Sequence, residues 1–556
     1  MRRIVAALAV LLAAGLVAAL AQADSHSGIA HGVSSANPRA GHPPNVVASG
    51  WELHNLVQGS SQLENPTSTF DTFGFLGDGA PPHLEATKTE PDENTYLVLK
   101  HPGGPTPGYD YGHHFLFQGH ENSGGKAYLT RVNLDVTDPA HRVTLLTPGD
   151  GSSTGFNSID GSTWDPFAGV LLYTQEAGTN GGVISQSPFW SSSTPPSTTT
   201  LYGSIGRGGF EGIHPDDEGN ILIIEDSGGQ GVPVDPNDST TPKVAKQPNS
   251  FVYRFVPSSP GDLEHGKLQV LQVSVDGHPV LFTCTPSGST CPASAAQAST
   301  DVFSNDQLRL HSGDSFPVKW VTIHDTATDG TASFDANAAA KGINSHGPDA
   351  KGTPFKRPEN AQFLPGSGFR TFYFDPTGDT DNRSGSRPDL AARGAWGSIF
   401  TVHLSSDRNT GTIQRWVLGD ADHAAFDNLA FLDKDTLLAA EDRGDLLHSQ
   451  LNKLDSVWAF DIDHSPSDAQ RFIALGRDPA SETDVNIGAL PCLATNTCGF
   501  TFQNEGDNEP TGVHVSDGDA STKGLLGSDP PGKDAHAFFT QQHGENHVFE
   551  IVRQGH

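Results

Sequence analysis

Short apolar runs recur along the chain, and six of them end in an acidic or amide residue. The runs are rich in Val, Ile, Leu, Phe and Thr, and turn-forming residues separate them. After residue 25 no long stretch shows the 3.6-residue period of an amphipathic helix, so the pattern predicts a predominantly β protein. The runs end at Glu121 in LFQGHEN, Glu176 in LLYTQEAG, Glu225 and Asp226 in ILIIEDSGG, Asp375 in TFYFDPTGD, Glu441 and Asp442 in LLAAEDRGD, and Gln542 and His543 in AFFTQQHG.

Three of these runs have a second acid 14 to 16 residues upstream, at the head of another apolar stretch: Glu211, Glu359 and Asp427. This indicates a repeated strand–turn–strand unit with a carboxylate at a fixed place. Repeats of this kind build radial β structures, whose equivalent positions converge on one axis. We therefore expect an all-β fold, a six-bladed β-propeller with long loop insertions. Five or seven blades stay open, because the copies are unevenly spaced.

The first 23 residues predict a secretory signal peptide, with Arg2 and Arg3 before an apolar core and Ala21-Gln22-Ala23 as the cleavage site. An uncleaved anchor is the alternative, because the apolar core is long. We expect a secreted protein, periplasmic or extracellular, that has no contact with a membrane after cleavage. The expected organisation is a signal peptide (1–23), a mobile leader (24–48) and a single propeller domain (49–556) with insertions near 185–200, 226–249, 280–350, 376–395 and 464–500.

The four cysteines form two close pairs, Cys284 with Cys291 and Cys492 with Cys498. In an exported chain this predicts two small disulfide loops, and the spacing does not favour zinc. The net charge of -32 argues against nucleic acid and anionic membranes as partners. Most of the acids are expected to be solvated, and the protein is expected to be a monomer.

Some of the acids are candidate cation ligands. On the innermost strand of a blade, alternate side chains face the central channel. Carboxylates gathered there repel each other unless cations lie among them, and an oxygen-only set suits calcium or a harder trivalent metal. The alternative is that these acids serve β-turns. The candidate ligands are Glu121, Glu176, Glu211, Glu359, Asp427, Asn428 and Glu509, with Glu225, Asp226, Glu441 and Asp442 as further candidates at the same mouth.

Two other residues are candidates for chemistry. Arg357 precedes Pro358 and Glu359, and a fixed cation beside a ligand carboxylate can bind a phosphate or carboxylate group. A structural ion pair is the alternative. His543 ends the last run and is a candidate ligand or proton donor, or else a turn histidine.

At these residues the chain resembles the PhoX-type alkaline phosphatases, a family of secreted bacterial β-propellers. The motifs that carry the resemblance extend from about residue 110 to the C-terminus, and they are GHENSGGKAYLTRVNLD, GSTWDPFAGVLLYTQEAG, FEGIHPDDEGNILIIEDS, YRFVPSSPGDLEHGKLQ, KRPENAQF, FDNLAF, EPTGVHVS and FFTQQHGENHVFEIV. The resemblance implies hydrolysis of small phosphate monoesters at a site that holds iron and calcium. It also implies glutamate ligands at Glu121, Glu176, Glu211 and Glu359, the pair Asp427 and Asn428, a late acid at Glu509, and Arg357 near the phosphate.

The chain departs from the family pattern at two places. Ser158 stands where the family carries a cysteine iron ligand, and Gly119 stands where an asparagine is usual. A hydroxyl is a poorer iron ligand than a thiolate, so these departures weaken the case for iron more than the case for calcium. The function expected is therefore a secreted metal-dependent hydrolase of phosphate esters. The alternatives are a calcium-dependent lactonase or esterase, and a non-catalytic calcium-binding propeller that binds a partner or glycan.

Overall fold

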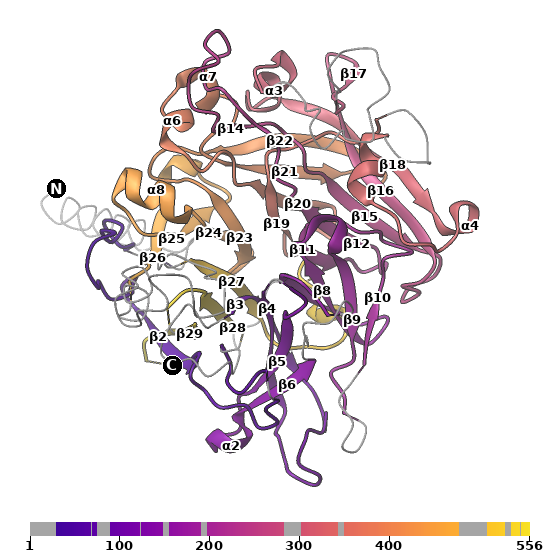
Figure 1. Ribbon diagram of the computed structural model, residues 1–556, viewed down its shortest axis with the longest axis vertical. Helices are drawn as coiled ribbons and strands as arrows, with labels where there is room; N and C mark the ends of the chain where they lie inside the picture. Colours follow the sequence, from indigo (N-terminus) through magenta and orange to yellow (C-terminus); the bar gives the residue numbers. More distant parts are fainter. Residues whose placement is uncertain are drawn as a thin grey trace, which may run out of the picture.

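The computed structural model describes residues 29, 31–67, 69–74, 89–122, 124–147, 155–190, 197–282, 302–342, 350–477, 509–528, 535–544 and 546–555. Most of its regular structure is antiparallel sheet, and the sheets are arranged radially around one axis (Figure 1). The fold is a β-propeller, as the sequence predicts. In the described residues no helix is long and apolar enough to cross a membrane.

Two four-stranded sheets come first in the chain, and in each the strands run in order from the axis to the rim. The first sheet consists of β3 (Glu90–Val98), β4 (His114–Glu121), β5 (Tyr128–Asn133) and β6 (Val143–Thr147). The second consists of β7 (Ile159–Asp165), β8 (Val170–Gln175), β9 (Gly182–Gln186) and β10 (Thr198–Thr200).

A ten-stranded sheet follows, and it has an innermost strand at each end. Its long strand β18 pairs with both β16 and β22, which joins two radial sectors at the rim. This strand lies in the stretch near 280–350 that the sequence analysis treats as an insertion. In sheet order the strands are β11 (Phe210–Pro215), β12 (Ile221–Glu225), β15 (Val252–Pro257), β16 (Gly266–Val275), β18 (Ser315–Asp325), β22 (Thr410–Leu418), β21 (Ser398–Leu404), β20 (Thr371–Pro376) and β19 (Pro358–Phe363), with β17 (His278–Pro279) beside β16.

The last two sheets are completed by strands from the start of the described chain. The ten-stranded sheet counts as the third and fourth sectors, so the next sheet is called the fifth-sector sheet. It runs β23 (Phe426–Phe431), β24 (Thr436–Glu441), β25 (Ser456–Asp461), β26 (Gln470–Ala474) and then β1 (Val46–Val47). The final sheet runs β27 (Pro510–Ser516), β28 (His536–Gln541), β29 (His547–Arg553) and then β2 (Trp51–Val57). Pairing of β2 with β29 therefore joins the two ends of the circle.

Short elements lie outside these sheets. A two-stranded ribbon joins β13 (Gly231–Val232) and β14 (Ala245–Lys246). The helices are α2 (Pro139–Arg142), α3 (Asn305–Leu310), α4 (Thr326–Asp329), α5 (Ala336–Lys341), α6 (Asn382–Gly385), α7 (Pro388–Ala391) and α8 (Gly444–Leu451), with 3₁₀ turns η2 (Gly178–Asn180), η4 (Pro466–Asp468) and η5 (Thr522–Gly524).

Six strands surround the axis: β3, β7, β11, β19, β23 and β27. Each contacts the next, and β27 contacts β3, so they form a closed ring. Each also carries a β-bulge at the same place in its pairing with the next strand outward. The six bulged strands agree with six structural repeats. Because two sectors share one continuous sheet, the number of blades itself stays a prediction.

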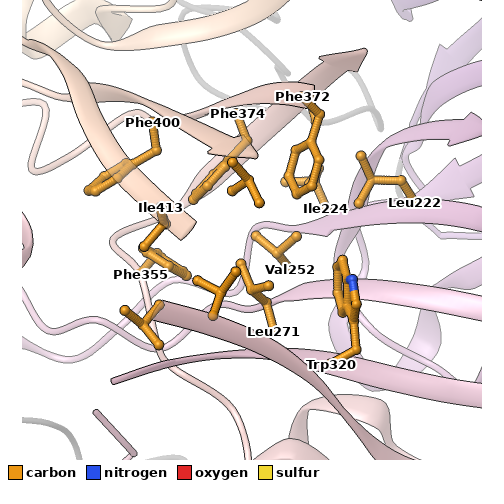
Figure 2. Packing of buried hydrophobic residues seen from close by; sticks show 14 of the residues in the cluster. Leu222, Ile224, Val252, Leu271, Trp320, Phe355, Phe372, Phe374, Phe400 and Ile413 are labelled. Atoms are coloured by element: carbon orange, nitrogen blue, oxygen red, sulfur yellow. The ribbon is translucent and has the colours of Figure 1, made fainter. Parts of the chain in front are cut away.

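Hydrophobic cores fill the wedges between neighbouring sectors, which holds the ring together. Figure 2 shows the largest one, between the two halves of the ten-stranded sheet. Leu222 and Ile224 of β12 face Phe372 and Phe374 of β20 there, and the aromatic ring of Trp320 in β18 closes one side. Burying such side chains is worth about 1.5–3 kcal/mol each, so the wedges dominate the stability of the fold.

Candidate metal centre

The six bulges place one residue of each innermost strand at an equivalent position around the axis. A bulge presents two residues opposite one on the partner strand and re-aims their side chains. At the first bulge position five of the six strands carry an acid, and β27 carries a glycine: Asp92, Asp160, Glu211, Glu359, Asp427 and Gly512.

Two further acids come from the ends of the second strands. Glu121 is the last residue of β4, and Glu176 directly follows β8. The side-chain oxygens form three overlapping groups, within each of which the atoms lie no more than 4.8 Å apart. The groups are Asp92, Glu121 and Asp160; Asp160, Glu176 and Glu211; and Glu211, Glu359 and Asp427. We call these seven residues the carboxylate centre.

Burial dominates the electrostatics of the carboxylate centre. Loss of solvent raises the pKa of Asp92 to about 7 and that of Glu176 to about 8, and repulsion from neighbouring acids adds to both shifts. The same two causes raise the pKa of Asp160 and of Glu211 well above the usual carboxyl range. Burial and mutual repulsion therefore disfavour full ionisation of the carboxylate centre when no cation is bound.

The donor set fits hard cations. No described residue donates a hydrogen bond to the side-chain oxygens of Asp160, Glu176 or Glu211. Asp160 and Glu211 are buried, and a buried carboxylate without a donor or counter-ion is costly. Several oxygens that converge without donors are what calcium prefers. The residues present therefore fit a cation such as calcium.

Uncharged side chains hold part of the carboxylate centre in place. The amide of Gln542 donates to Asp92 Oδ2 at 2.9 Å and to Glu121 Oε2 at 3.3 Å, so it bridges two of the acids. Thr511, beside the glycine of β27, donates its hydroxyl to Asp92. At the second bulge position, Glu93 accepts hydrogen bonds from the Ser162 backbone N–H at 2.8 Å and from the Asn360 amide. These contacts orient the acids in the absence of a metal.

Arg357 lies at the edge of the carboxylate centre. Its Nε donates to Asp226 Oδ2 at 2.8 Å, and its Nη2 is 3.5 Å from Glu359 Oε1. Burial alone would lower the pKa of Arg357, but the two carboxylates outweigh it and raise the pKa, so the guanidinium stays charged. Its side chain is 23 % exposed, which leaves part of the planar fork open to a ligand. The backbone of Arg357 has φ 51°, a strained conformation that re-aims the side chain.

The structure places three other predicted residues near the carboxylate centre. Glu509 has Asp442, Asp427 and Asp92 as charged neighbours, and its Oε2 is 3.6 Å from Nε2 of His543. The Asn428 side chain donates to Asp427 at 3.1 Å, and its carbonyl oxygen accepts the Val513 backbone N–H at 3.4 Å, so it orients the acid. Ser158 accepts the backbone N–H of Glu176 on its carbonyl oxygen and precedes β7 by one residue.

The paired acids at the ends of β12 and β24 divide their roles. Asp226 holds Arg357, whereas Glu225 is directed away and accepts from Tyr253 and Asn337 at 2.8 and 3.0 Å. Asp442 is a charged neighbour of Asp92, Asp427 and Glu509.

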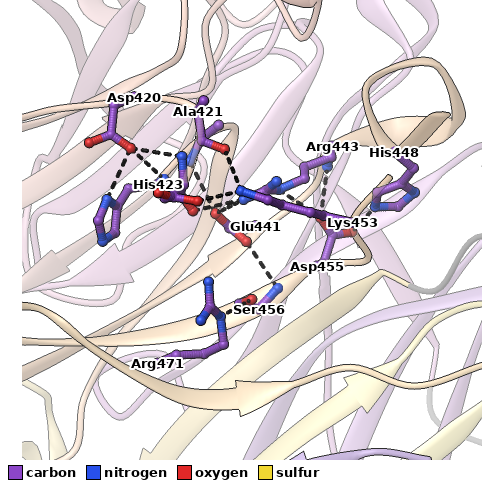
Figure 3. A network of polar contacts seen from close by, with 12 residues as sticks. Asp420, Ala421, His423, Glu441, Arg443, His448, Lys453, Asp455, Ser456 and Arg471 are labelled. Atoms are coloured by element: carbon purple, nitrogen blue, oxygen red, sulfur yellow. Dashed lines mark hydrogen bonds and ion pairs between the residues drawn. The ribbon is translucent and has the colours of Figure 1, made fainter. Parts of the chain in front are cut away.

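Glu441 lies instead in a buried network with Arg443 and Ser456 (Figure 3). Its Oε1 is 2.6 Å from Nη2 of Arg443, and its Oε2 accepts the Ser456 backbone N–H at 3.0 Å. The structure therefore brings Asp226 and Asp442 to the carboxylate centre but not Glu225 and Glu441.

Sequence reasoning missed Asp92 and Asp160. Ile159-Asp160-Gly161 has the same form as Phe210-Glu211-Gly212, an apolar residue, an acid and a small residue, and this signal could have identified Asp160. Pro91-Asp92-Glu93 likewise matches Pro358-Glu359-Asn360. The four cysteines predicted to form disulfides lie outside the described residues.

Fold and site together define a β-propeller with a carboxylate centre on its axis. No family model matches the chain, and no curated protein matches it. Among solved structures, Pseudomonas fluorescens PhoX in complex with the transition-state analogue vanadate is similar over 93 % of this chain and 97 % of that chain, at 11 % identity and a TM-score of 0.48. The WD40 domain of Toxoplasma gondii coronin covers 94 % of this chain and 90 % of its own, at 9 % identity and a TM-score of 0.34. The PQQ-bound aldose sugar dehydrogenase of Streptomyces coelicolor covers 63 % and 93 %, at 12 % identity and a TM-score of 0.23.

Proposed function

We propose that this protein is a metal-dependent hydrolase of phosphate esters, with its active site at the carboxylate centre. The observation that carries the proposal is the position of Arg357. A charged guanidinium, held by Asp226 and Glu359 and partly exposed, lies beside a group of acids that fit cations. Arg is suited to bind phosphate through its planar fork, and cations beside it would complete a site for a phosphoryl group.

The residues of this chain have distinct parts in the proposed reaction. Bound cations would polarise the phosphoryl oxygens and favour an attacking oxygen at neutral pH. Glu359 and Asp226 fix the direction of the Arg357 fork, which would stabilise negative charge on the phosphoryl oxygens in the transition state. Gln542 and Thr511 hold Asp92 in place, so that the carboxylates need not reorganise when cations bind.

We propose calcium as the resident cation, because the donors are oxygens. The position that carries an iron-binding cysteine in the PhoX-type family is Ser158 in this chain, beside the backbone of Glu176. A neutral hydroxyl supports iron less well than a thiolate does. The substrate we propose is a small phosphorylated molecule, with the protein acting after export.

The test is hydrolysis of p-nitrophenyl phosphate by protein purified without chelators, with its metal content measured by mass spectrometry. Arg357→Ala should reduce kcat/KM by about 100-fold, the size expected for loss of one transition-state contact, with the metal content unchanged. Arg309→Ala is the matched control, because Arg309 pairs with Asp276 at the surface.

Equal activity of Arg357→Ala and wild type would refute the role of Arg357. A wild-type protein that holds calcium but does not hydrolyse phosphate esters would favour the lactonase or the non-catalytic binding alternative.

A further inference from the structure

A polar groove lies at the outer side of the fifth-sector sheet, away from the carboxylate centre. It has a volume of about 470 Å³ and lies between the segment 32–36 and the strands β25 and β26. Three cationic or imidazole side chains line it, and one acid lies among them: His423, Lys453, Arg471 and Asp422. Figure 3 shows His423, Lys453 and Arg471 around the Glu441–Arg443 network.

Arg471 is the central group of this groove. The residue is only 7 % exposed, and its guanidinium stacks on the indole of Trp458 at 4.3 Å. Nε donates to Ser456 Oγ at 2.9 Å, and Nη1 reaches the Val33 carbonyl at the limiting distance of 3.5 Å. Among the described residues it forms no ion pair. The stacking fixes the plane of the fork, so its outer N–H groups are pre-organised for an oxyanion.

Two more nitrogen-bearing side chains complete the wall. His423 packs against Trp458 as well, with 4.1 Å between the ring centroids, and its Nδ1 is 3.1 Å from Asp420. That contact directs its Nε2 away from Asp420. The ammonium of Lys453 pairs with Asp422, and the lysine side chain is 30 % exposed, so it can turn to a ligand. Ser34 and Ser35 also line the groove.

From this geometry we propose that the groove is a binding site for a small oxyanion, namely a phosphate group, held by Arg471, Lys453 and His423. The group can belong to free inorganic phosphate or to a phosphate ester. The volume leaves room for an organic part beside the phosphate, and Ser34, Ser35 and Asp422 are suited to hydrogen bonds with hydroxyl groups. The site is independent of the carboxylate centre and of the proposed hydrolysis.

Calorimetric titration of the intact protein tests the proposal with inorganic phosphate, glucose 6-phosphate and glucose as probes. Titrations are made in the Arg357→Ala background, which weakens phosphate binding at the proposed catalytic site, and the part of the binding that depends on Lys453 is the readout for the groove. Lys453→Ala should weaken phosphate binding by at least about tenfold, the size expected for one charge-assisted hydrogen bond. Lys319→Ala, at a groove on β18, is the matched control and should leave binding unchanged. Arg471→Lys keeps the charge but removes the fork, and it should also weaken binding.

The outcomes separate the sources and can overturn the proposal. Equal affinity for inorganic phosphate and glucose 6-phosphate would mean that the groove recognises the phosphate group alone. A preference for glucose 6-phosphate would mean that its ligand is a phosphate ester. Both results support the site. The proposal is wrong if neither phosphate binds, if glucose binds as well as glucose 6-phosphate, or if folded Lys453→Ala binds phosphate as tightly as Lys319→Ala. A protein without phosphatase activity that still binds phosphate through Lys453 would refute the proposed function and leave this site intact.

Discussion

At the scale of single residues, Glu211 is one of the two acids that link the oxygen groups of the carboxylate centre, and Asp160 is the other. Glu211 belongs to two of the three oxygen groups, with Asp160 and Glu176 on one side and Glu359 and Asp427 on the other. Burial raises its pKa, and the charge of Asp160 adds to the shift. Glu211 therefore destabilises the metal-free protein when it is ionised, and it would stabilise the metal-bound protein.

Glu211→Gln should accordingly have opposite effects in the two states. With calcium present, loss of a ligand should reduce bound metal and lower the melting temperature. With a chelator present, removal of a buried charge should raise the melting temperature above that of wild type. Thermal unfolding in calcium and in chelator measures both effects, and Glu264→Gln, at an exposed position, is the control. A change of the same sign in both conditions would argue against a cation at Glu211.

The pKa shifts predict how the stability of the metal-free protein depends on pH. Asp92 and Glu176 have folded-state pKa values of about 7 and about 8, against ordinary values of 3.8 and 4.5. The folded state therefore binds more protons than the unfolded state, and its stability falls as pH rises from about 4 to about 8. Urea unfolding in chelator, measured across this range, should show that fall. Calcium should flatten the profile, because it replaces the protons. A metal-free protein that becomes more stable between about pH 5 and pH 8 would contradict the prediction.

Single residues also show where sequence reasoning stops. The acids of Phe210-Glu211-Gly212, Pro358-Glu359-Asn360 and Phe426-Asp427-Asn428 could be predicted to face the axis, because each heads an apolar strand. The sequence could not predict which of two adjacent acids, such as Glu225 and Asp226, faces the axis. Glu225 and Asp226 point to opposite sides because side chains alternate along a strand, and only the register of the bulge decides which one turns inward.

At the scale of the element, the bulge of β27 differs from the other five. Its first bulge position is Gly512, with φ 59°, and a Cβ there would lie 2.5 Å from the Asp92 carbonyl oxygen. The close approach lets β27 pack against β3, where the Asn94 amide donates to the Gly512 carbonyl at 2.8 Å. The acid missing from this position has a counterpart in Glu509, which reaches the same neighbourhood from outside the strand.

Gly512→Ala should therefore cost more than backbone strain alone. An alanine in this left-handed conformation costs about 1–2 kcal/mol, and the clash with β3 should add about 1–3 kcal/mol. Gly169→Ala is the matched control, because Gly169 has φ 67° and no atom lies within 4 Å of the place that an alanine methyl group would take. Urea denaturation of both variants gives the difference. Equal losses of stability would mean that β27 and β3 can separate without cost.

Elements differ in how far the sequence predicts them. The pairs β11–β12, β19–β20 and β23–β24 follow from apolar runs that are joined by turn residues. β18 does not, because it lies in a stretch whose cysteines and polar residues suggest an insertion. Its partners β16 and β22 are 135 residues apart at their closest ends (Val275 and Thr410), and local pattern carries no information on such pairing.

At the scale of the whole molecule, the carboxylate centre depends on closure of the ring. Its acids come from β3, β7, β11, β19 and β23 and from the ends of β4 and β8, so no single sheet can form it. The circle is completed where β2 pairs with β29. Trp51 of β2 packs edge-on against Phe472 of β26 at 5.1 Å, and Arg553 covers its ring at 4.7 Å. This tryptophan therefore ties the last sheet to its neighbour.

Trp51→Ala should lower metal affinity although Trp51 lies on an outermost strand. Truncation of a buried tryptophan costs about 3–5 kcal/mol, and a ring that opens more easily would release any cations bound at the carboxylate centre together. We expect the urea midpoints of unfolding and of calcium release to fall by the same amount, as measured by tryptophan fluorescence and a calcium indicator. Phe189→Ala, at a side chain that is 43 % exposed, should move neither midpoint. If unfolding shifts while calcium release does not, the carboxylate centre is held by its local strands, and closure of the ring does not control it.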